Sequence, residues 1–416
     1  MSENEIQVPD LQGPAPVPFI PREPVPEVIT SDIALRSYAD KLREASGPFA
    51  LDAERASGFK YSQRAYLIQL RRTGAGTALI DPIPVPDLSV IQEATDGVEW
   101  ILHAASQDLA CLAEVGLRPK RLFDTELAGR LLGRERVSLG HLVASELGEH
   151  LEKGHGAADW SLRPLTSAQL LYAALDVELL VELRDVMCAE LDREGKLAWA
   201  FEEFDALLTF TPRDRGGDPW RRTSGIHKIR KPRALAVVRA LWLARDEVAQ
   251  HEDIAPGRIL PDAAIAAAAT ILPATSAALG EIREFSGRGQ TRRRATWWSA
   301  ISSALALPES QLPAGALPAS GPPAPRAWAE RDPQAFARLE AARAGLKEIS
   351  ERVSVPVENL ISPELVRRVC WTPPVATLGL AEVLRAGGAR PWQLELTGPA
   401  LEFALSARPR TVVTGE

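Results

Sequence analysis

Acidic side chains occur in three short blocks of this chain, in a pattern that suits the binding of metal ions. Asp52 and Glu54 end an apolar run, Asp108 follows another, and Asp176 lies four residues after Tyr172. Carboxylates are ligands that hard divalent cations prefer. Two such cations about 4 Å apart can hold the attacking and the leaving oxygen while a phosphodiester is hydrolysed. The four acids therefore indicate a two-metal phosphodiesterase site.

The expected secondary structure places the paired side chains on one face of their element. Alternation in a strand puts Asp52 and Glu54 on the same face, where their charges repel unless a cation lies between them. In a helix, Tyr172 and Asp176 lie one turn apart on the same face. Each block alone also fits a structural role: a surface strand, the edge of a core or, for Asp108, a carboxylate that caps a helix.

Composition divides the chain into an arm, three folded units and their connections. The first 31 residues carry seven prolines and predict a flexible arm. Next come runs typical of strands at 49–53, 65–70, 77–81 and 98–103, and then helical periodicity at 107–115, 124–132, 138–147 and 167–193. This order predicts a mixed α/β domain over 32–210. The remaining expected parts are a basic linker at 211–231, a helical domain at 232–304, a proline-rich linker at 305–327, a second helical domain at 328–406 and a tail at 407–416.

The two helical segments share an order of features. Each has a charged amphipathic helix, a short turn with proline, an apolar residue and a further helix, beginning near Leu235 and Leu339. A shared order at a spacing of roughly 100 residues favours a duplicated domain. Chance similarity between two small helical bundles is the alternative.

Taken together and in this order, the blocks resemble the motifs of the DEDD superfamily of 3′–5′ exonucleases, in the subgroup with a tyrosine in the third motif. The resemblance covers about residues 47–195 and is closest to the ribonuclease D family. It includes Gln69, Asp81, the segment 103–108, Asp124 and the segment 159–165. Residues 232–304 resemble an HRDC domain through the segments 241–247 and 259–262, and residues 328–406 look like a second, diverged copy. The implied fold class is α/β: a ribonuclease H-like exonuclease domain with a mixed sheet, followed by two all-α HRDC-like domains.

The resemblance also implies a mechanism with two divalent metal ions, Mg²⁺ or Mn²⁺. Asp52, Glu54 and Asp176 would hold one ion, and Asp52 would bridge to a second, on which Asp108 acts directly or through water. Tyr172 would orient or deprotonate the attacking water, although a phenol with a pKa near 10 is a poor base at neutral pH. The implied reaction releases 5′-mononucleotides from a 3′-hydroxyl end, in RNA 3′-end processing such as tRNA maturation.

Further residues are candidates for contact with the nucleic acid. Some lie where the terminal nucleotide could bind, others in a loop suited to phosphate or base contact, and others in the basic linker, where they can neutralise phosphates. The same residues also fit bland roles: His103 as a hydrogen-bonded core histidine, Trp160 as packing and the linker as a solvated surface. The candidates in these three groups are Gln69, His103 and Ser106; Lys153, Trp160 and Arg163; and Arg221, Arg222, Lys228, Arg230 and Lys231.

Composition and missing motifs limit the other classes of function. The net charge of −7, 45% hydrophobic residues and the lack of a long apolar run predict a cytoplasmic protein without a membrane segment, which we expect to be a monomer that binds RNA or DNA. A helicase is excluded because the chain has no Gly-x-x-x-x-Gly-Lys phosphate loop. Two alternatives stay open. One is a DNA exonuclease, and the other is a non-catalytic nucleic-acid-binding protein, against which the intact acids argue.

Overall fold

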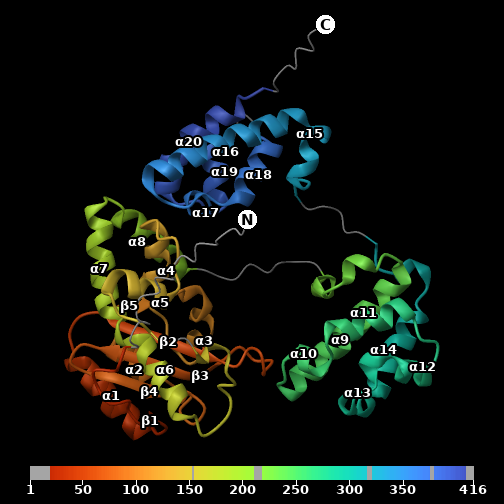
Figure 1. Cartoon of the computed structure of the whole chain (residues 1–416), viewed down its shortest axis with the longest axis horizontal. Helices are drawn as coiled ribbons and strands as arrows, with labels where there is room; N and C mark the ends of the chain where they lie inside the picture. The colour runs from red at the N-terminus through yellow and green to blue at the C-terminus, as the bar shows by residue number, and fades with distance from the viewer. Residues whose placement is uncertain (1–18, 152–153, 210–217, 316–320, 375–378, 409–416) are drawn as a thin grey trace, which may run out of the picture.

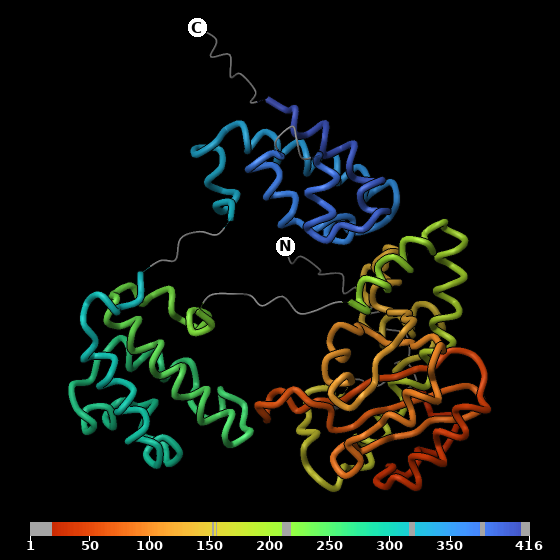
Figure 2. Tube along the Cα trace, turned by 180° about the vertical axis from the view of Figure 1, so that it is seen from behind, coloured from red at the N-terminus to blue at the C-terminus, as the bar shows by residue number. Residues whose placement is uncertain are grey.

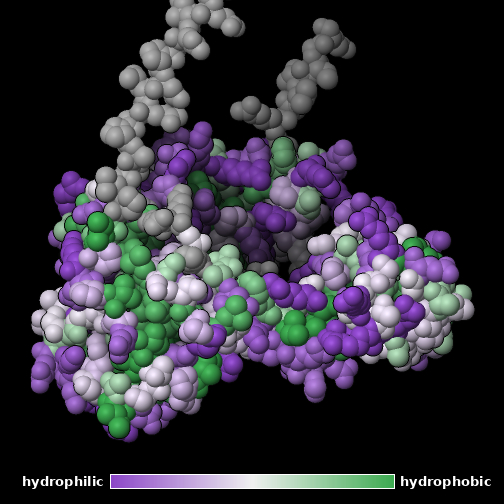
Figure 3. All heavy atoms as spheres, turned by 60° about the horizontal axis from the view of Figure 1, so that its bottom comes forward, coloured by the Kyte–Doolittle hydropathy of each residue, from purple (hydrophilic) through white to green (hydrophobic). Residues whose placement is uncertain are grey.

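The structure, a computed structural model, describes residues 19–151, 154–209, 218–315, 321–374 and 379–408. Three units are visible in them, one α/β and two helical, and both views show the units arranged as an open ring (Figures 1 and 2). The space-filling view shows the hollow between the units, with hydrophilic side chains at its rim (Figure 3). None of the described helices combines the length and the apolar character needed to span a bilayer.

A single mixed sheet organises the first unit. Its strand order is β1-β4-β3-β2-β5-β6. The pairs β2–β3 and β3–β4 are antiparallel, and the pairs β1–β4, β2–β5 and β5–β6 are parallel. The expected mixed sheet is therefore confirmed. The strands span Val28–Ile29 (β1), Phe49–Arg55 (β2), Ala65–Arg72 (β3), Gly76–Ile80 (β4), Glu99–Leu102 (β5) and Arg121–Asp124 (β6).

Alternation along the strands gives the sheet two different faces. On one face, Ile68 and Leu70 pack into the large core that contains residues of α1 and α2. On the other, Leu67 and Leu79 join a smaller cluster with Ala173 of α6. The helices of this unit are α1 (Asp32–Glu44), α2 (Ser89–Ala94), α3 (Leu109–Glu114), α4 (Thr125–Leu131), α5 (Leu139–Leu142), α6 (Ser167–Glu178), α7 (Leu180–Arg193) and α8 (Leu197–Leu208).

Three expectations for this unit need correction. The arm predicted for 1–31 is wrong for its described part, because Val28 and Ile29 pair with β4 and Phe19 packs against the core. The helix predicted over 167–193 is two helices, α6 and α7, which meet at Leu179. Strand β6 was not expected. Its four residues are too few to show the alternation of a strand. They form a strand because they pair with β5.

The two helical units begin with the same order of elements, and their origin by duplication stays a prediction. In the first, α9 (Pro232–Glu252) ends at Asp253 with φ 48° and leads into α10 (Pro256–Ile259). In the second, α16 (Pro333–Val353) ends at Ser354 with φ 52° and leads into α17 (Val357–Leu360). The other helices are α11 (Asp262–Ile271), α12 (Ser276–Glu281), α13 (Arg288–Arg292), α14 (Arg294–Leu305), α15 (Trp328–Arg331), α18 (Pro363–Trp371), α19 (Leu380–Ala386) and α20 (Pro391–Leu405).

The second helical unit docks on the α/β unit through a tryptophan pair. The rings of Trp199 and Trp392 stack with their centroids 5.0 Å apart. The indole N–H of Trp392 donates to Glu203 at 3.0 Å, and Arg390 pairs with the same carboxylate at 3.1 Å. Ile349 and Trp392 belong to the core cluster of the α/β unit. The two units therefore share buried apolar surface, which is the main stabilising term in such contacts.

Replacing Gly133 by alanine is expected to loosen this docking. A Cβ at Gly133 would lie 2.3 Å from the carbonyl oxygen of Ser354, which belongs to the other unit. Gly133 also has φ +70°, so alanine adds backbone strain, and overpacking of this kind costs about 1–3 kcal/mol. Gly148→Ala is the matched control, because its φ is +72° and no atom lies within 4 Å of the added Cβ.

Urea unfolding of both glycine variants measures the difference. The expected result is a lower unfolding free energy for Gly133→Ala than for Gly148→Ala, together with a larger radius of gyration in solution scattering. Equal stability and equal size for the two variants would contradict the docking seen here.

Candidate active site

Strand β2 carries the first two acids at the centre of the sheet. Asp52 pairs with Gln69 of β3, and Glu54 pairs with Leu67. Both acids therefore lie on the sheet face that α6 covers, as alternation predicted. Gln69 is fully buried and donates from Nε2 to the Asp52 carboxylate at 3.0 Å.

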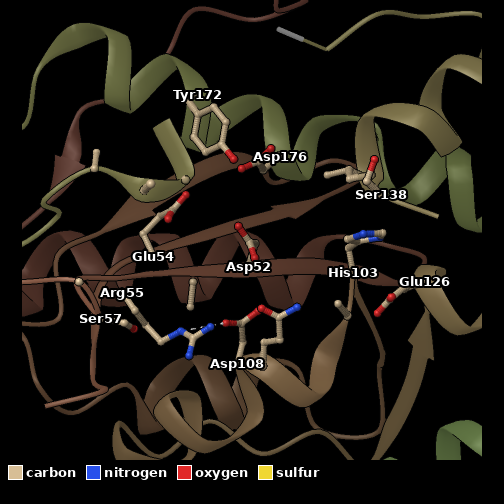
Figure 4. A pocket seen from close by; sticks show the side chains of 18 of the residues that line it. Asp52, Glu54, Arg55, Ser57, His103, Asp108, Glu126, Ser138, Tyr172 and Asp176 are labelled. Carbon is tan, nitrogen blue, oxygen red and sulfur yellow. Dashed lines mark ion pairs between the residues drawn. The ribbon is translucent and has the colours of Figure 1, made fainter. Parts of the chain in front are cut away.

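Helix α6 supplies the third block. Its N-terminus is fixed by a capping box, in which the side chain of Thr166 accepts from the backbone N–H of Gln169 and the Gln169 side chain accepts from the N–H of Thr166. The helix then carries Tyr172 and Asp176 one turn apart, and the phenol donates a hydrogen bond to the Asp176 carboxylate. Figure 4 shows both side chains pointing across the cavity toward Asp52.

A tight turn after β5 delivers Asp108. Ala104 adopts φ 56°, in the left-handed region, and the chain continues through a short 3₁₀ turn over Ala105–Gln107. Asp124 holds this turn, since its carboxylate accepts from the N–H groups of Ala104 at 3.2 Å and Ala105 at 2.8 Å. The same carboxylate caps α4. Asp124 therefore both caps α4 and supports the turn that carries Asp108.

Asp108 itself does not cap a helix. It stands at the N-terminal boundary of α3, but its side chain makes no capping hydrogen bond there. The carboxylate instead lies 3.5 Å from Nε of Arg55, with which it forms an ion pair (Figure 4). The capping alternative for Asp108 is therefore rejected, and its carboxylate belongs to the cavity.

The five motif side chains line one cavity of about 570 Å³. They come from β2, from the turn between β5 and α3, and from α6. These segments are far apart in sequence, but β5 pairs with β2 in the sheet and α6 packs against β2. Further lining residues come from β2, the β2–β3 loop, the β5–α3 turn, α4 and the start of α5. Those that bear on the argument below are Arg55, Ser57, Gly58, Phe59, His103 and Glu126.

Burial raises the pKa values of all four acids, and repulsion between the carboxylates adds to the effect at Glu54, Asp108 and Asp176. Burial, followed by the neighbouring acids Asp52, Asp176 and Asp108, raises the pKa of Glu54 to about 9. Burial and then Asp52 raise the pKa of Asp108 to about 8, against an opposing effect of Arg55. The pKa of Asp52 is raised by burial, and that of Asp176 by burial and then by Asp52. Such a pocket favours a positive charge among its carboxylates.

The acids also have the geometry of a cation site. One ligand oxygen from each of Asp52, Glu54 and Asp176 can be chosen so that all three lie within 4.8 Å of one another. Asp108 is not part of that group among the described residues, and it faces Asp52 from the other side of the cavity (Figure 4). An all-oxygen donor set with several negative charges fits a hard divalent cation. The arrangement of these carboxylates therefore fits a divalent metal ion.

Two of the three residues expected near the terminal nucleotide do not reach the cavity. His103 lines it, and its Nδ1 lies 2.9 Å from Oγ1 of Thr125, while burial lowers its pKa to about 4. Ser106 is exposed and lies outside the described lining. Gln69 is fully buried, so it orients Asp52 and does not touch a substrate. Sequence alone could not separate these cases, because the burial of each side chain depends on how the elements of the unit pack together.

The loop before α6 is held by its own contacts. Trp160 is fully buried, and its ring centre lies 6.3 Å from that of Tyr172. The side chain therefore packs the loop, as one alternative predicted, and is not exposed for stacking on a base. Arg163 donates to both oxygens of Asp81, at 2.5 and 2.9 Å, and to the carbonyl of Tyr66 at 2.7 Å. Its guanidinium therefore fastens the loop to the sheet. Lys153 lies outside the described residues.

The described part of the basic linker, residues 218–231, presents most of its positive charge to solvent. Arg221 pairs with Asp218 at 3.1 Å and stacks on Trp220, which is buried in the core of the first helical unit. Contact of the linker with nucleic acid stays a prediction. The exposed residues of this group are Arg222, Lys228, Arg230 and Lys231.

Sequence reasoning missed Arg55. The alternation that pairs Asp52 with Glu54 would turn the next residue to the opposite face. A register shift between Glu54 and Arg55 breaks that alternation and brings the guanidinium to Asp108. The available signal was a lone arginine at the end of a buried strand, a position where a buried charge needs a partner.

Three family models match the chain. Residues 26–192 match a 3′-5′ exonuclease model, residues 234–301 match the HRDC domain, and residues 321–405 match a 3′ to 5′ exonuclease C-terminal domain. The last of these is a different model from HRDC, so the view of residues 328–406 as a second HRDC copy stays a prediction.

Similar proteins share most of the chain. Ribonuclease D of Gluconacetobacter diazotrophicus is 32% identical over 302 residues, which cover 70% of this chain and 75% of that protein. Ribonuclease D of Acidiphilium cryptum is 31% identical over 354 residues, covering 82% and 86%. A crystal structure of a protein from Bifidobacterium adolescentis superposes with a TM-score of 0.87 at 40% identity, covering 92% and 98%. That of Escherichia coli RNase D has a TM-score of 0.66 at 25% identity and covers 91% and 98%. With the acidic cavity, these similarities show that the chain belongs to the ribonuclease D family and is a 3′–5′ exonuclease.

Proposed function

We propose that this exonuclease removes 5′-mononucleotides one at a time from the 3′-hydroxyl ends of structured RNAs, precursors of transfer RNA among them. The carrying observation is the convergence of Asp52, Glu54, Asp108, Tyr172 and Asp176 on one cavity. The similar E. coli protein is described as an exoribonuclease involved in structured RNA processing, which supports RNA as the substrate.

We further propose that the site takes two divalent ions, Mg²⁺ or Mn²⁺. Asp52, Glu54 and Asp176 would hold one, and Asp52 with Asp108 would hold the other, Asp108 directly or through water. Bound ions of this kind lower the pKa of water and neutralise charge on the phosphate oxygens. The donor set supports this assignment because the four motif carboxylates face one cavity, and Arg55, paired with Asp108, is the one arginine or lysine among its described lining residues.

The protein's own side chains orient these groups. Gln69 fixes one oxygen of Asp52, so the carboxylate keeps a single orientation between its neighbours. Tyr172 is a hydrogen-bond donor to Asp176, and a phenol with a reference pKa near 10 stays protonated at neutral pH. Tyr172 therefore positions the attacking water by hydrogen bonding and does not remove its proton. Asp124 acts at a distance by holding the turn that carries Asp108.

The exposed linker charges are expected to bind the RNA backbone. In the triple variant Lys228→Ala, Arg230→Ala and Lys231→Ala, three phosphate contacts are lost. For single-stranded RNA, the slope of log affinity against log salt concentration is expected to fall in magnitude by about 2. Affinity measured by fluorescence anisotropy across a salt series tests this expectation. An unchanged slope would show that these side chains do not contact phosphate.

The same RNA and a DNA strand of equal sequence test the choice of nucleic acid. We expect faster release of mononucleotides from RNA than from DNA in Mg²⁺ or Mn²⁺. Equal or faster release from DNA would favour the DNA exonuclease alternative, because two-metal chemistry does not itself require a 2′-hydroxyl group.

A further inference from the structure

The loop between β2 and β3 connects the catalytic cavity to the first helical unit. Residues 234–301 of that unit match the HRDC domain, so it is called the HRDC unit below. Ser57, Gly58 and Phe59 line the cavity. Two residues further on, Tyr61 packs against the hydrophobic core of the HRDC unit. Figures 1 and 2 both show this loop reaching out from the sheet to α9 and α10. One short segment is therefore part of the cavity wall and part of a domain contact.

The start of α10 grips the cavity side of the loop. The guanidinium of Arg258 lies 4.0 Å from the centre of the Phe59 ring, and its Nε donates to the carbonyl of Gly58 at 2.7 Å. The backbone N–H of Ala255 donates to the carbonyl of Phe59 at 2.9 Å. Both carbonyls belong to residues that line the cavity, so the HRDC unit fixes the backbone of the wall directly.

The end of α9 grips the other side of the same loop. Asp253 follows the helix in a left-handed conformation, and its carboxylate accepts from the backbone N–H of Ser62 at 2.9 Å. The hydroxyl of Tyr61 lies 3.3 Å from both carboxylate oxygens of Asp246. Lys60 lies 3.8 Å from Asp253, a weaker contact between partly exposed groups. The loop is thus held at both ends of the turn.

Phe59 carries this restraint toward the catalytic tyrosine. Its ring packs against the cluster formed by residues of β3, α6 and the loop before α6, which contains Trp160 and Tyr172. Phe59 and Tyr61 thus anchor one turn in two different cores. A turn with only one of these anchors would lose the contacts that set its distance from the cavity.

We propose that the HRDC unit completes the catalytic cavity, with Arg258 and Asp253 as positioning residues that hold the wall formed by residues 57–59. This inference deepens the proposed function and rests on it in one respect, namely that the cavity is where the phosphodiester is cleaved. The competing view is that the HRDC unit only grips RNA outside the cavity. The two views differ for a substrate too short to be gripped there.

A diribonucleotide is the substrate that separates these views. It contains one phosphodiester, the one that is cleaved, so it offers no second backbone phosphate for an outside contact. Cleavage of the diribonucleotide by the wild-type protein in Mn²⁺ checks the proposed function independently of any variant. The inference is then tested by the KM and kcat of HRDC variants of the full chain on the diribonucleotide and on a 20-nucleotide RNA.

Arg258→Ala and Asp253→Ala are expected to raise KM for the diribonucleotide about tenfold, the scale of a small misplacement of substrate-binding groups. Asp253→Asn is the matched control and is expected to stay near wild type, because its side-chain oxygen still accepts from Ser62 and asparagine tolerates the left-handed conformation. Arg258→Lys is expected to behave like Arg258→Ala, since lysine lacks the planar group that stacks and donates from Nε.

Three results would overturn the inference. The first is an unchanged KM for the diribonucleotide in Arg258→Ala and Asp253→Ala with a raised KM for the long RNA, which would place the HRDC contact outside the cavity. The second is full recovery in Arg258→Lys, which would indicate a simple charge contact with phosphate. The third is an equal rise in KM for Asp253→Asn and Asp253→Ala. The linker variant described above should show the reverse pattern, with KM raised only for the long RNA.

Discussion

Replacing Asp52 or Asp176 by asparagine is expected to lower the rate of metal-dependent cleavage by roughly 10²- to 10³-fold, the scale set by loss of one preorganised electrostatic contact in an active site. Both acids contribute an oxygen to the group that fits a divalent cation. An amide is a neutral and weaker ligand, so the cation loses affinity and its position. The measurement is mononucleotide release from a labelled RNA in Mn²⁺. Activity near wild type in either variant would contradict the site.

The same variants are expected to keep their fold. In the absence of metal, they should be at least as stable as the wild-type protein. The pKa values of Asp52 and Asp176 are raised in the folded protein, so each ionised carboxylate destabilises the fold at neutral pH, above its unfolded pKa. The neutral amide removes that cost. Melting temperatures in EDTA should therefore be equal to or above that of the wild-type protein.

Added metal should stabilise the wild-type protein more than the asparagine variants. A ligand that binds only the folded state raises the melting temperature, so Mn²⁺ is expected to stabilise the wild-type protein and to do so less in Asp52→Asn. Glu126→Gln is the control, because Glu126 lines the same cavity but lies outside the group of metal-binding oxygens. An equal rise in melting temperature for the wild-type protein and Asp52→Asn would contradict the assignment of Asp52 as a ligand.

Trp160→Ala is expected to cost about 3–5 kcal/mol of stability, the usual price of removing a large buried aromatic ring. Trp160 is fully buried and packs beside Tyr172, so its loss also removes a packing contact of the Tyr172 ring. We therefore expect kcat to fall as well as the unfolding free energy. Urea unfolding and steady-state kinetics on the same preparation measure both effects.

Trp160→Phe is the matched variant for this position. It keeps an aromatic ring in the cluster, and we expect it to retain most of the stability and activity. A tryptophan that stacked on a base would behave differently: Trp160→Ala would raise KM for RNA while the unfolding free energy stayed the same. That pattern would contradict the packing role that the structure assigns to Trp160.

Local pattern was sufficient to predict the centre of the catalytic unit. Alternation placed Asp52 and Glu54 on one face of β2, and helical spacing placed Tyr172 and Asp176 one turn apart, because both depend only on the geometry of a single element. Strands β2, β3, β4 and β5 were predicted for the same reason. The order of the three blocks and their resemblance to a known family supplied the convergence of the side chains, which no single element determines.

Contacts between elements account for most of what was not predicted. The two residues of β1 form a strand only because β4 lies beside them. Arg55 reaches Asp108 through a register shift that no sequence pattern marks. Arg258 lies 200 residues from Gly58, and the hydrogen bond between them exists only after the HRDC unit has docked.

The misplaced candidates have a common physical cause. Gln69, Trp160 and Arg163 are polar or amphipathic residues near the motifs, so each was a reasonable choice for contact with nucleic acid. In the folded chain, Gln69 and Trp160 are fully buried and Arg163 is bound to Asp81. Gln69 orients Asp52, Trp160 packs beside Tyr172, and Arg163 attaches the loop before α6 to the sheet. Burial of this kind follows from how α6 and its preceding loop cover the sheet, which is a property of the tertiary structure.

The direct test of the central claim is to incubate the full-length protein with Mn²⁺ and two RNAs of one sequence. One RNA is linear, with a 3′-hydroxyl end and a 5′ label, and the other is circular. The site described here predicts a ladder of 5′-labelled products that shorten one nucleotide at a time, release of 5′-mononucleotides and an intact circle. With Asp52→Asn, the ladder and the mononucleotides should form far more slowly. Cleavage of the circle, or release of the 5′ label as the first product, would contradict a 3′–5′ exonuclease built on these five side chains.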